Sequence, residues 1–116
     1  MPQFLLTWLL TALSLVVTAY LVPGITVDGV SAAAIGAIVL GLVNAIVKPI
    51  LIVLTLPLTL FTFGLFLFVV NAIALSLVGL LTPGFTVAGF AAALIGSIIL
   101  SIVSAILNIA FGSKRR

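Results

Sequence analysis

Four long apolar stretches, separated by prolines, glycines or charged residues, make up most of the chain. They cover about residues 4–22, 31–49, 65–81 and 91–111. A helix rises about 1.5 Å per residue, so about 17–25 apolar residues are enough to cross the roughly 30 Å hydrocarbon core of a bilayer. The pattern therefore predicts an all-α integral membrane helical bundle with about four transmembrane helices.

An internal repeat is visible when the two halves are compared at an offset of 60 residues. The string PGITVDGVSAAAIGAIVLGLVNAI, which begins at Pro23, returns as PGFTVAGFAAALIGSIILSIVSAI, which begins at Pro83. Apolar composition alone would not restore the shared Pro-Gly-x-Thr-Val-x-Gly string. Each copy is a helix, a Pro-Gly turn and a second helix, so it crosses twice and the two copies are parallel rather than inverted.

We therefore expect a single transmembrane domain over residues 1–116, built from two helix hairpins. Its expected parts are repeat one at about 4–51, an apolar segment at about 52–63, repeat two at about 64–111 and a basic tail at 112–116. The Pro-Gly pairs are interpreted as tight interhelical turns without a ligand, because proline fixes φ and glycine accepts a positive φ. Both turns are expected to face the same compartment.

The stretch PILIVLTLPLTLFTF at 49–63 has no counterpart in the repeat pattern. It is apolar throughout and contains a second proline, Pro57. Two interpretations stay open: the stretch lengthens the flanking helices, or it forms a short re-entrant or interfacial hairpin. In the second case neighbouring helices must cover its backbone, because lipid cannot satisfy free N–H and C=O groups.

Composition supports a lipid environment. Of the residues, 66% are hydrophobic and 4% are charged, and the mean hydropathy is +1.69. So few charges cannot cover the surface of a soluble domain of this length. A cleaved signal peptide is the competing interpretation of residues 1–22, but this stretch has no basic n-region and no A-x-A-like cleavage site. We expect it to be a retained span.

The few charges favour one orientation. The only acid, Asp28, follows the first Pro-Gly turn, whereas the bases follow the second and fourth apolar stretches. These bases are Lys48, Lys114, Arg115 and Arg116. By the positive-inside rule the basic side is cytoplasmic, so both termini are expected inside. We expect the tail bases Lys114, Arg115 and Arg116 to contact lipid head groups.

The residue types that perform chemistry are nearly absent. Cysteine, histidine and glutamate do not occur, and one carboxylate cannot supply a general acid and base pair. The sequence thus predicts no enzyme activity, no metal site and no cofactor. The basic tail has no accompanying basic face or aromatic platform, so nucleic-acid binding is not expected either.

Small residues recur at every fourth position of the second and fourth apolar stretches, and we call these rows the small-residue ladders. The ladders are Gly29, Ala33, Ala37, Gly41 and Ala45, and Gly89, Ala93, Ser97, Ser101 and Ala105. In lipid, helices associate by close backbone approach over such ridges. We favour packing inside the subunit, with the two equivalent helices paired, over packing between subunits.

Two polar groupings are candidates for functional roles. The polar stripe lies on one face of the first stretch and comprises Thr7, Thr11, Ser14 and Thr18. It either lines a wet path in an oligomer or hydrogen-bonds to carbonyls four residues earlier or to a neighbouring helix. The polar cluster comprises Asn44, Lys48, Asn71, Ser104 and Asn108. It either forms a buried amide cluster or consists of interhelical amides with Lys48 extended to the head groups.

A set of short motifs carries a resemblance to a known family. They are NAIVKPIL from Asn44, LPLT from Leu56, FGL from Phe63, NA from Asn71 and PGF from Pro83. In these motifs the chain resembles the bacterial four-span phage holin family, superfamily IV, which includes YvlD-like membrane proteins, over nearly its whole length. The resemblance implies a small bacterial inner-membrane protein that forms homo-oligomers and permeabilises the membrane.

A second interpretation is a structural or accessory subunit, or a scaffold, of a larger membrane complex without pore activity. On this interpretation the partners are other membrane proteins as well as membrane lipids. A solute transporter is a third and weaker alternative, because ionisable groups at the membrane midplane are lacking.

Overall fold

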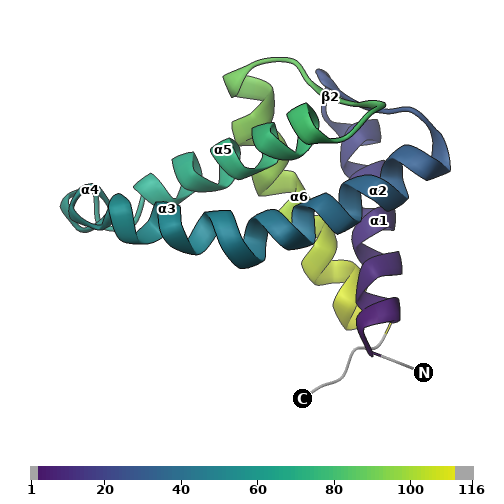
Figure 1. Cartoon of the computed structure of the whole chain (residues 1–116), viewed down its shortest axis with the longest axis horizontal. Helices are drawn as coiled ribbons and strands as arrows, with labels where there is room; N and C mark the ends of the chain where they lie inside the picture. Colours follow the sequence, from purple (N-terminus) through teal and green to yellow (C-terminus); the bar gives the residue numbers. More distant parts are fainter. Residues whose placement is uncertain (1–2, 112–116) are drawn as a thin grey trace.

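The computed structural model describes residues 3–111, which fold into helices joined by one short two-stranded ribbon (Figure 1). The elements in chain order are α1 (Gln3–Leu21), β1 (Ile25–Val27), α2 (Gly29–Leu42), the π-helical turn η1 (Val43–Val47), α3 (Lys48–Leu54), α4 (Leu56–Phe61), α5 (Phe66–Leu81), β2 (Phe85–Val87) and α6 (Phe90–Ala110).

The second membrane helix is longer than predicted. The sequence pattern predicts its end near Pro49, whereas α2, η1 and α3 form one uninterrupted helix of 26 residues, Gly29–Leu54. Proline inside a helix lacks an N–H donor and its ring clashes with the preceding turn. The π turn directly before it widens the helix there, and this accommodates the ring without ending the helix.

The segment at 49–63 is thereby divided into two parts. Its first part lengthens the second membrane helix as far as Leu54, and its second part forms the separate short helix α4. A turn with Phe63 at φ 55° and Gly64 at φ 89° then leads into α5. The Gly64 N–H donates to the Thr59 carbonyl at 2.7 Å, which closes the end of α4.

Each Pro-Gly turn continues into a three-residue strand, which the sequence pattern did not predict. The strands β1 and β2 pair antiparallel, and Thr26 lies opposite Thr86. Two further hydrogen bonds flank the ribbon: the Asp28 N–H donates to the Gly84 carbonyl at 2.8 Å, and the Ala88 N–H donates to the Gly24 carbonyl at 2.7 Å. Each contact between the two repeats recurs with the roles of the repeats exchanged, as the Asp28–Gly84 and Ala88–Gly24 hydrogen bonds show. A local two-fold axis therefore passes through the ribbon.

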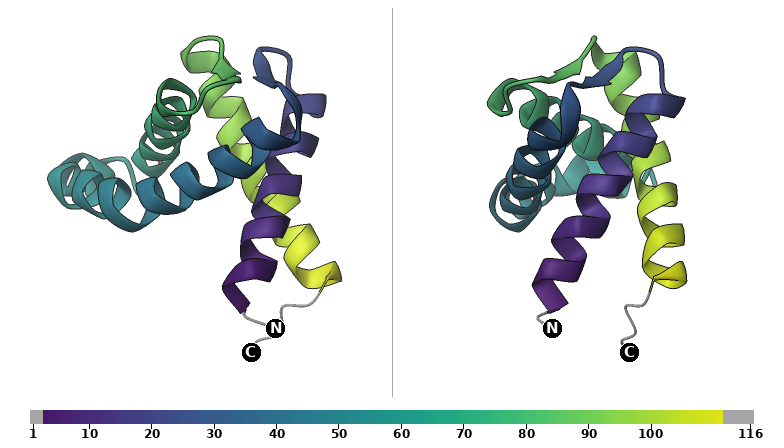
Figure 2. Two further views of the ribbon diagram at one scale, coloured as in Figure 1. Left: turned by 45° about the vertical axis from the view of Figure 1, so that its right-hand side comes forward. Right: turned by 90° about the vertical axis from the view of Figure 1, so that its right-hand side faces the viewer.

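The four long helices form two arms that diverge from the ribbon (Figures 1 and 2). The first arm contains α1 and α6, and the second arm contains α5 beside the continuous α2–η1–α3 helix. Near the ribbon the arms also contact each other, α1 with α2 and α5 with α6. The first turn of α1 and the last turn of α6 both lie at the end of the first arm that is away from the ribbon (Figure 2).

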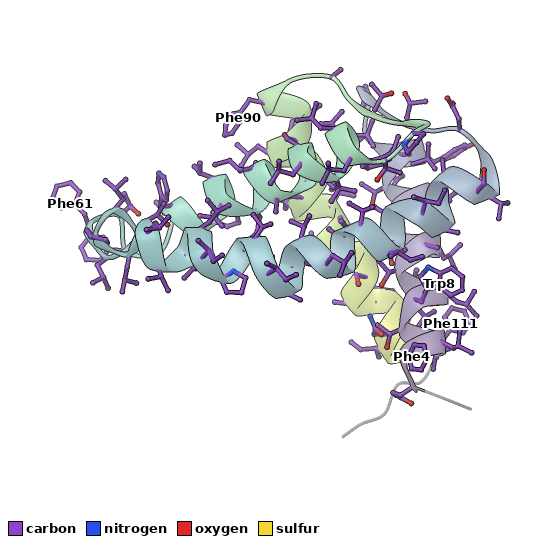
Figure 3. The ribbon with its side chains drawn as sticks, viewed as in Figure 1. Phe4, Trp8, Phe61, Phe90 and Phe111 are labelled. Carbon is purple, nitrogen blue, oxygen red and sulfur yellow. The ribbon has the colours of Figure 1, made fainter. Side chains whose placement is uncertain are left out.

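The hydrophobic core lies where the two arms meet the ribbon. Its buried members include Leu15 from α1, Leu75 and Val78 from α5, and Ile25 and Phe85 from the strands. Away from this junction large apolar side chains point outward; Figure 3 shows Phe61 on α4, which is 83% exposed, and Phe90 at the start of α6. Such a surface fits a lipid environment.

Among the described residues, three helices are long and apolar enough to cross a membrane: Gln3–Leu21, Gly29–Leu54 and Phe90–Ala110. The fourth, α5, is apolar but has 16 residues, a length of about 24 Å. The chain is an all-α membrane helical bundle, as predicted, with the ribbon as its one addition.

Candidate functional site: a polar cleft between the arms

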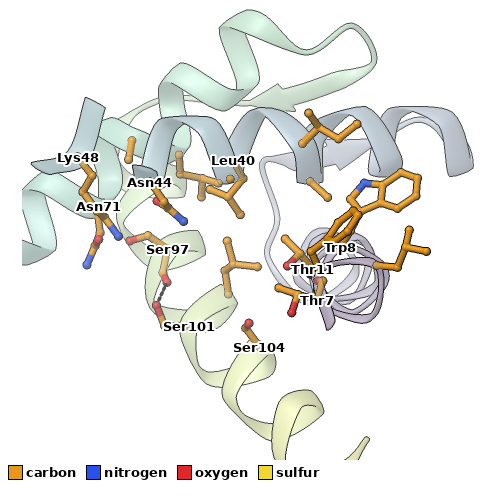
Figure 4. A pocket seen from close by; sticks show the side chains of 18 of the residues that line it. Thr7, Trp8, Thr11, Leu40, Asn44, Lys48, Asn71, Ser97, Ser101 and Ser104 are labelled. Carbon is orange, nitrogen blue, oxygen red and sulfur yellow. Dashed lines mark hydrogen bonds between the residues drawn. The ribbon is translucent and has the colours of Figure 1, made fainter. Parts of the chain in front are cut away.

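A cleft of about 880 Å³ lies between the two arms, on the side away from the ribbon (Figure 4). Its volume is within the range of about 300–1,000 Å³ that is typical of small-molecule sites. All four long helices contribute polar side chains to its wall. These are Gln3, Thr7, Thr11, Asn44, Lys48, Asn71, Ser97, Ser101 and Ser104.

The cleft lies on the repeat axis, because most of its wall comes in pairs at the repeat offset. The pairs are Thr11 with Asn71, Ala37 with Ser97, Leu40 with Leu100, Gly41 with Ser101, and Asn44 with Ser104. Two of these pairs, Ala37 with Ser97 and Gly41 with Ser101, consist of one residue from each small-residue ladder. The duplicated sequence thus builds both walls of one cleft, with more polar atoms than either copy has alone.

The small-residue ladders divide into buried and exposed positions. The buried members are Ala33, Ala37, Ala93 and Ser97, and the exposed members are Gly29, Gly41, Ala45, Gly89, Ser101 and Ala105. Gly29 and Gly89 have φ angles of 90° and 102°, so these two glycines are needed to start their helices.

The prediction that the two ladder helices pair with each other is wrong. The main neighbours of α2 are α1 and α5, and those of α6 are also α5 and α1. Instead, ladder positions farther from the ribbon face each other across the cleft. Gly41 lies on one wall and Ser101 on the other. The splayed arms separate the two helices beyond direct packing.

Sequence reasoning missed the glycines at which helices come closest. A Cβ atom on Gly36 would lie 3.3 Å from the Leu15 side chain, and one on Gly96 would lie 3.2 Å from Leu75 and would clash with Ile25. Gly36 and Gly96 are equivalent in the repeat, and each is buried. A glycine recurs at this position in both copies of the repeat, and that recurrence was the available signal. Neither glycine is at a ladder position, because the ladders follow a different set of residues spaced by four.

The polar stripe does not remain together. Thr7 and Thr11 line the cleft, whereas Ser14 and Thr18 are buried in the junction of the arms. The Thr11 hydroxyl donates to the Thr7 carbonyl and the Ser14 hydroxyl to the Leu10 carbonyl, both at 2.7 Å. The Thr18 hydroxyl has no hydrogen-bond partner within residues 3–111. A polar path along the whole stripe is therefore interrupted by the core.

The polar cluster contributes four of its five members to the cleft. Asn44, Lys48 and Asn71 lie close together on one wall (Figure 4), with Ser104 across from them. Asn108 is outside the cleft, and its side-chain amide donates to the Ser104 carbonyl at 2.7 Å. Asn44 is exposed and Asn71 half-buried, so these residues line an open cleft and are not a buried amide cluster.

Trp8 is a site residue that the sequence did not single out. Its indole Nε1–H donates to the Ala34 carbonyl at 3.0 Å, which ties α1 to α2 beside the cleft. The ring also lines the cleft (Figure 4). An aromatic ring with one polar atom is suited to such a boundary between apolar and polar surroundings.

Charge is distributed unevenly over the described part of the chain. Lys48 is its only base and Asp28 its only acid, and Asp28 lies beside the ribbon rather than in the cleft. The cleft wall therefore carries a positive charge with no carboxylate beside it. The tail residues Lys114, Arg115 and Arg116, expected at lipid head groups, lie outside the described residues.

Comparison with known proteins identifies a family. A family model described as "Mycobacterial 4 TMS phage holin, superfamily IV" matches residues 2–106. No curated protein and no solved structure matches the chain. The matched region includes all of the residues that line the cleft.

Proposed function

The chain belongs to the mycobacterial 4 TMS phage holin family, superfamily IV, and from this premise we propose that it self-associates in the bacterial inner membrane and permeabilises the bilayer once assembled. It is a phage-holin-like multi-pass membrane protein. The observation that carries the proposal is the cleft, where all four long helices place polar side chains in an otherwise apolar molecule.

Self-association is supported by the ladder positions that folding leaves exposed. Ala45 and Ala105 are exposed and do not line the cleft, so no other helix of the same subunit covers them. Between helices in lipid there is little hydrophobic driving force, and small residues allow the close backbone approach that stabilises association. Two copies can therefore pack through the outer parts of α2–η1 and α6.

Permeabilisation requires more than one copy. In a single subunit the cleft ends at the core around Leu15, Leu75 and Val78, so it does not cross the molecule. A polar path through the bilayer needs cleft walls from several subunits to face one another. On this proposal the walls with Asn44 and Asn71 are turned toward the shared path, since polar groups in lipid are stable only against partners or water.

An accessory or scaffold role without pore activity is the second candidate. The burial of Ser14 and Thr18 favours it, because a polar stripe along the whole of α1 is then unavailable to water. On this alternative the cleft serves to hold a partner or a lipid, and the exposed ladder positions contact another membrane protein.

Expression with a membrane-potential dye separates the two functions. We expect the wild-type protein to dissipate the potential, and Asn71→Leu to reduce this effect because it removes a polar group from the cleft wall. Asn108→Leu is the matched control, since Asn108 lies outside the cleft. An unchanged potential at an expression level verified in isolated membranes contradicts permeabilisation and supports the accessory role.

The oligomeric state tests self-association on its own. We expect the protein in native nanodiscs to form a homo-oligomer, and Ala45→Leu together with Ala105→Leu to lower its order, because two large side chains prevent close approach. Ala91→Leu adds the same side chain at an exposed position of α6 outside the ladders. A wild-type protein that is monomeric in nanodiscs would show the proposal to be wrong.

A further inference from the structure

We propose that the cleft binds one phospholipid with an anionic head group, whose phosphate contacts Lys48 and whose acyl chain lies along the apolar part of the wall. This inference goes beyond the proposed function and does not depend on it, since a single subunit already contains the complete cleft.

The charge of the cleft calls for an anion. Lys48 lies on its wall, and no carboxylate is among the residues that line it. A cationic side chain at the edge of apolar surroundings is stabilised by an opposite charge. Asp28 cannot supply that charge, because it lies beside the ribbon, at the other end of the arms.

Two amide groups beside Lys48 have hydrogen-bonding capacity to spare. Within residues 3–111, the side chains of Asn44 and Asn71 make no hydrogen bond, and both point into the cleft near Lys48 (Figure 4). By contrast, the Ser101 hydroxyl donates to the Ser97 carbonyl at 2.9 Å, and the Ser97 hydroxyl donates to the Leu94 carbonyl at 3.0 Å. One ammonium and two amide N–H₂ groups on one wall provide the donors that phosphate oxygens accept.

Lys48 reaches the cleft through a feature that only one repeat has. Its equivalent in the second repeat, Asn108, does not line the cleft and donates to Ser104 in its own helix. The π turn η1 directly precedes Lys48, whereas α6 is a regular α-helix over the equivalent residues. Because a π turn rotates the following residues about the helix axis, Lys48 and Asn108 present their side chains differently. Such turns are frequent at functional sites.

The remainder of the wall matches the apolar part of a lipid. Leu40, Leu75 and Leu100 line the cleft beside the polar groups, so that one side of the cavity is apolar and one is polar. Lys48 lies six residues before Leu54, the end of its helix, or about 9 Å along the axis. A lysine at this distance from the helix end can extend its ammonium group toward the head groups. Basic pockets between transmembrane helices are known to recognise anionic head groups.

Native mass spectrometry of the full chain, released from detergent, tests the proposal. The probes are phosphatidylglycerol and phosphatidylcholine with identical acyl chains. We expect one phosphatidylglycerol to be retained per subunit in preference to phosphatidylcholine, and Lys48→Gln to weaken that binding roughly fivefold, the effect of losing one head-group charge contact. The matched control is Ser31→Glu, which makes the same change in net charge at an exposed position of α2 outside the cleft and is expected to leave the preference intact.

A second variant tests the apolar part of the cleft. Gly41 lines the wall, and a Cβ atom there would meet nothing within 4 Å, so Gly41→Leu is expected to fold while its side chain fills the cleft. It should reduce retention of phosphatidylglycerol, whereas Ala91→Leu, at an exposed position outside the cleft, should not. Circular dichroism of each variant verifies its helical content.

Three results overturn the proposal. The first is equal retention of both lipids by the wild-type protein. The second is equal weakening by Lys48→Gln and Ser31→Glu, which means that net charge alone attracts the lipid. The third is displacement of the lipid by inorganic phosphate at millimolar concentration, which identifies the site as one for a free anion. None of these results bears on permeabilisation, which the membrane-potential measurement tests separately.

Discussion

Thr26 lies directly opposite Thr86 in the antiparallel ribbon, and the two threonines are equivalent residues of the two repeats. A residue that pairs with its own repeat copy must lie on the axis that relates the copies. The ribbon therefore aligns the two hairpins with each other. The pairing of cleft residues such as Thr11 with Asn71 follows from the same axis.

The first prediction concerns this pairing. Residues opposite each other in an antiparallel ribbon have Cα atoms about 4.5–5.5 Å apart, within the range of a disulfide. The chain has no cysteine of its own, so the double variant Thr26→Cys and Thr86→Cys should form one internal disulfide under mild oxidation. Loss of maleimide labelling that is reversed by reductant measures it.

The control for the disulfide is the pair Thr26→Cys and Asn108→Cys. Asn108 lies near the last turn of α6, at the end of the first arm away from the ribbon. This pair should keep both thiols free at the same oxidant concentration. If the two double variants oxidise equally, the ribbon does not hold Thr26 against Thr86.

The second prediction concerns the close approach at Gly96. Gly96→Ala should destabilise the protein by about 1–3 kcal/mol, the usual cost of overpacking a filled core, because the added methyl group meets Ile25 and Leu75.

The matched control is Gly41→Ala. Gly41 lies in α2, which is the helix of the first repeat that corresponds to α6, and the methyl group there enters open space. That variant should be neutral or more stable by up to about 1 kcal/mol. Thermal unfolding in detergent, followed by circular dichroism, compares the two. Equal effects of the variants would contradict the packing described for Gly96.

The third prediction concerns the link from Trp8 to Ala34. Trp8→Phe keeps a large aromatic ring but removes the Nε1–H that donates across to α2. We expect a loss of stability of about 0.5–1.5 kcal/mol, the net contribution of one hydrogen bond. Tyr20→Phe also removes one polar atom from an aromatic ring, yet Tyr20 is 91% exposed and this variant should leave the unfolding temperature unchanged. A Trp8→Phe protein as stable as the wild type would show that the bond contributes nothing.

The membrane-spanning helices were predictable from the sequence because lipid imposes a simple rule on them. Each helix must hydrogen-bond its own backbone polar groups and must be long and apolar. A stretch such as 4–22 meets these requirements whatever its neighbours are. The bounds were less predictable. Pro49 normally marks a helix end, but the π turn before it provides a local alternative that composition does not reveal.

The ribbon and the cleft were not predictable because both depend on contacts far apart in the sequence. Strands of three residues, such as Ile25–Val27, are too short to have a recognisable pattern, and their partners are 60 residues away. The repeat related Thr11 to Asn71 and Gly41 to Ser101, but it did not say whether such pairs touch or face each other across a space. That depends on the angle between the arms, which the helical periodicity does not determine.

The last prediction concerns orientation, which the proposal requires. Positive charge is retained on the cytoplasmic side, so Asp28 beside the ribbon should face the periplasm and the chain end should face the cytoplasm. In intact cells treated to admit reagent to the periplasm, a membrane-impermeant maleimide should label Asp28→Cys. It should label Ser113→Cys only after the inner membrane is opened, and the wild-type chain, which has no cysteine, gives the background. Because the first arm runs from the ribbon to the first turn of α1 and the last turn of α6, labelling of the two positions from the same side would mean that this arm does not cross the membrane. In that case the cleft would lie outside the bilayer, and neither permeabilisation nor lipid binding by its wall would have a physical basis.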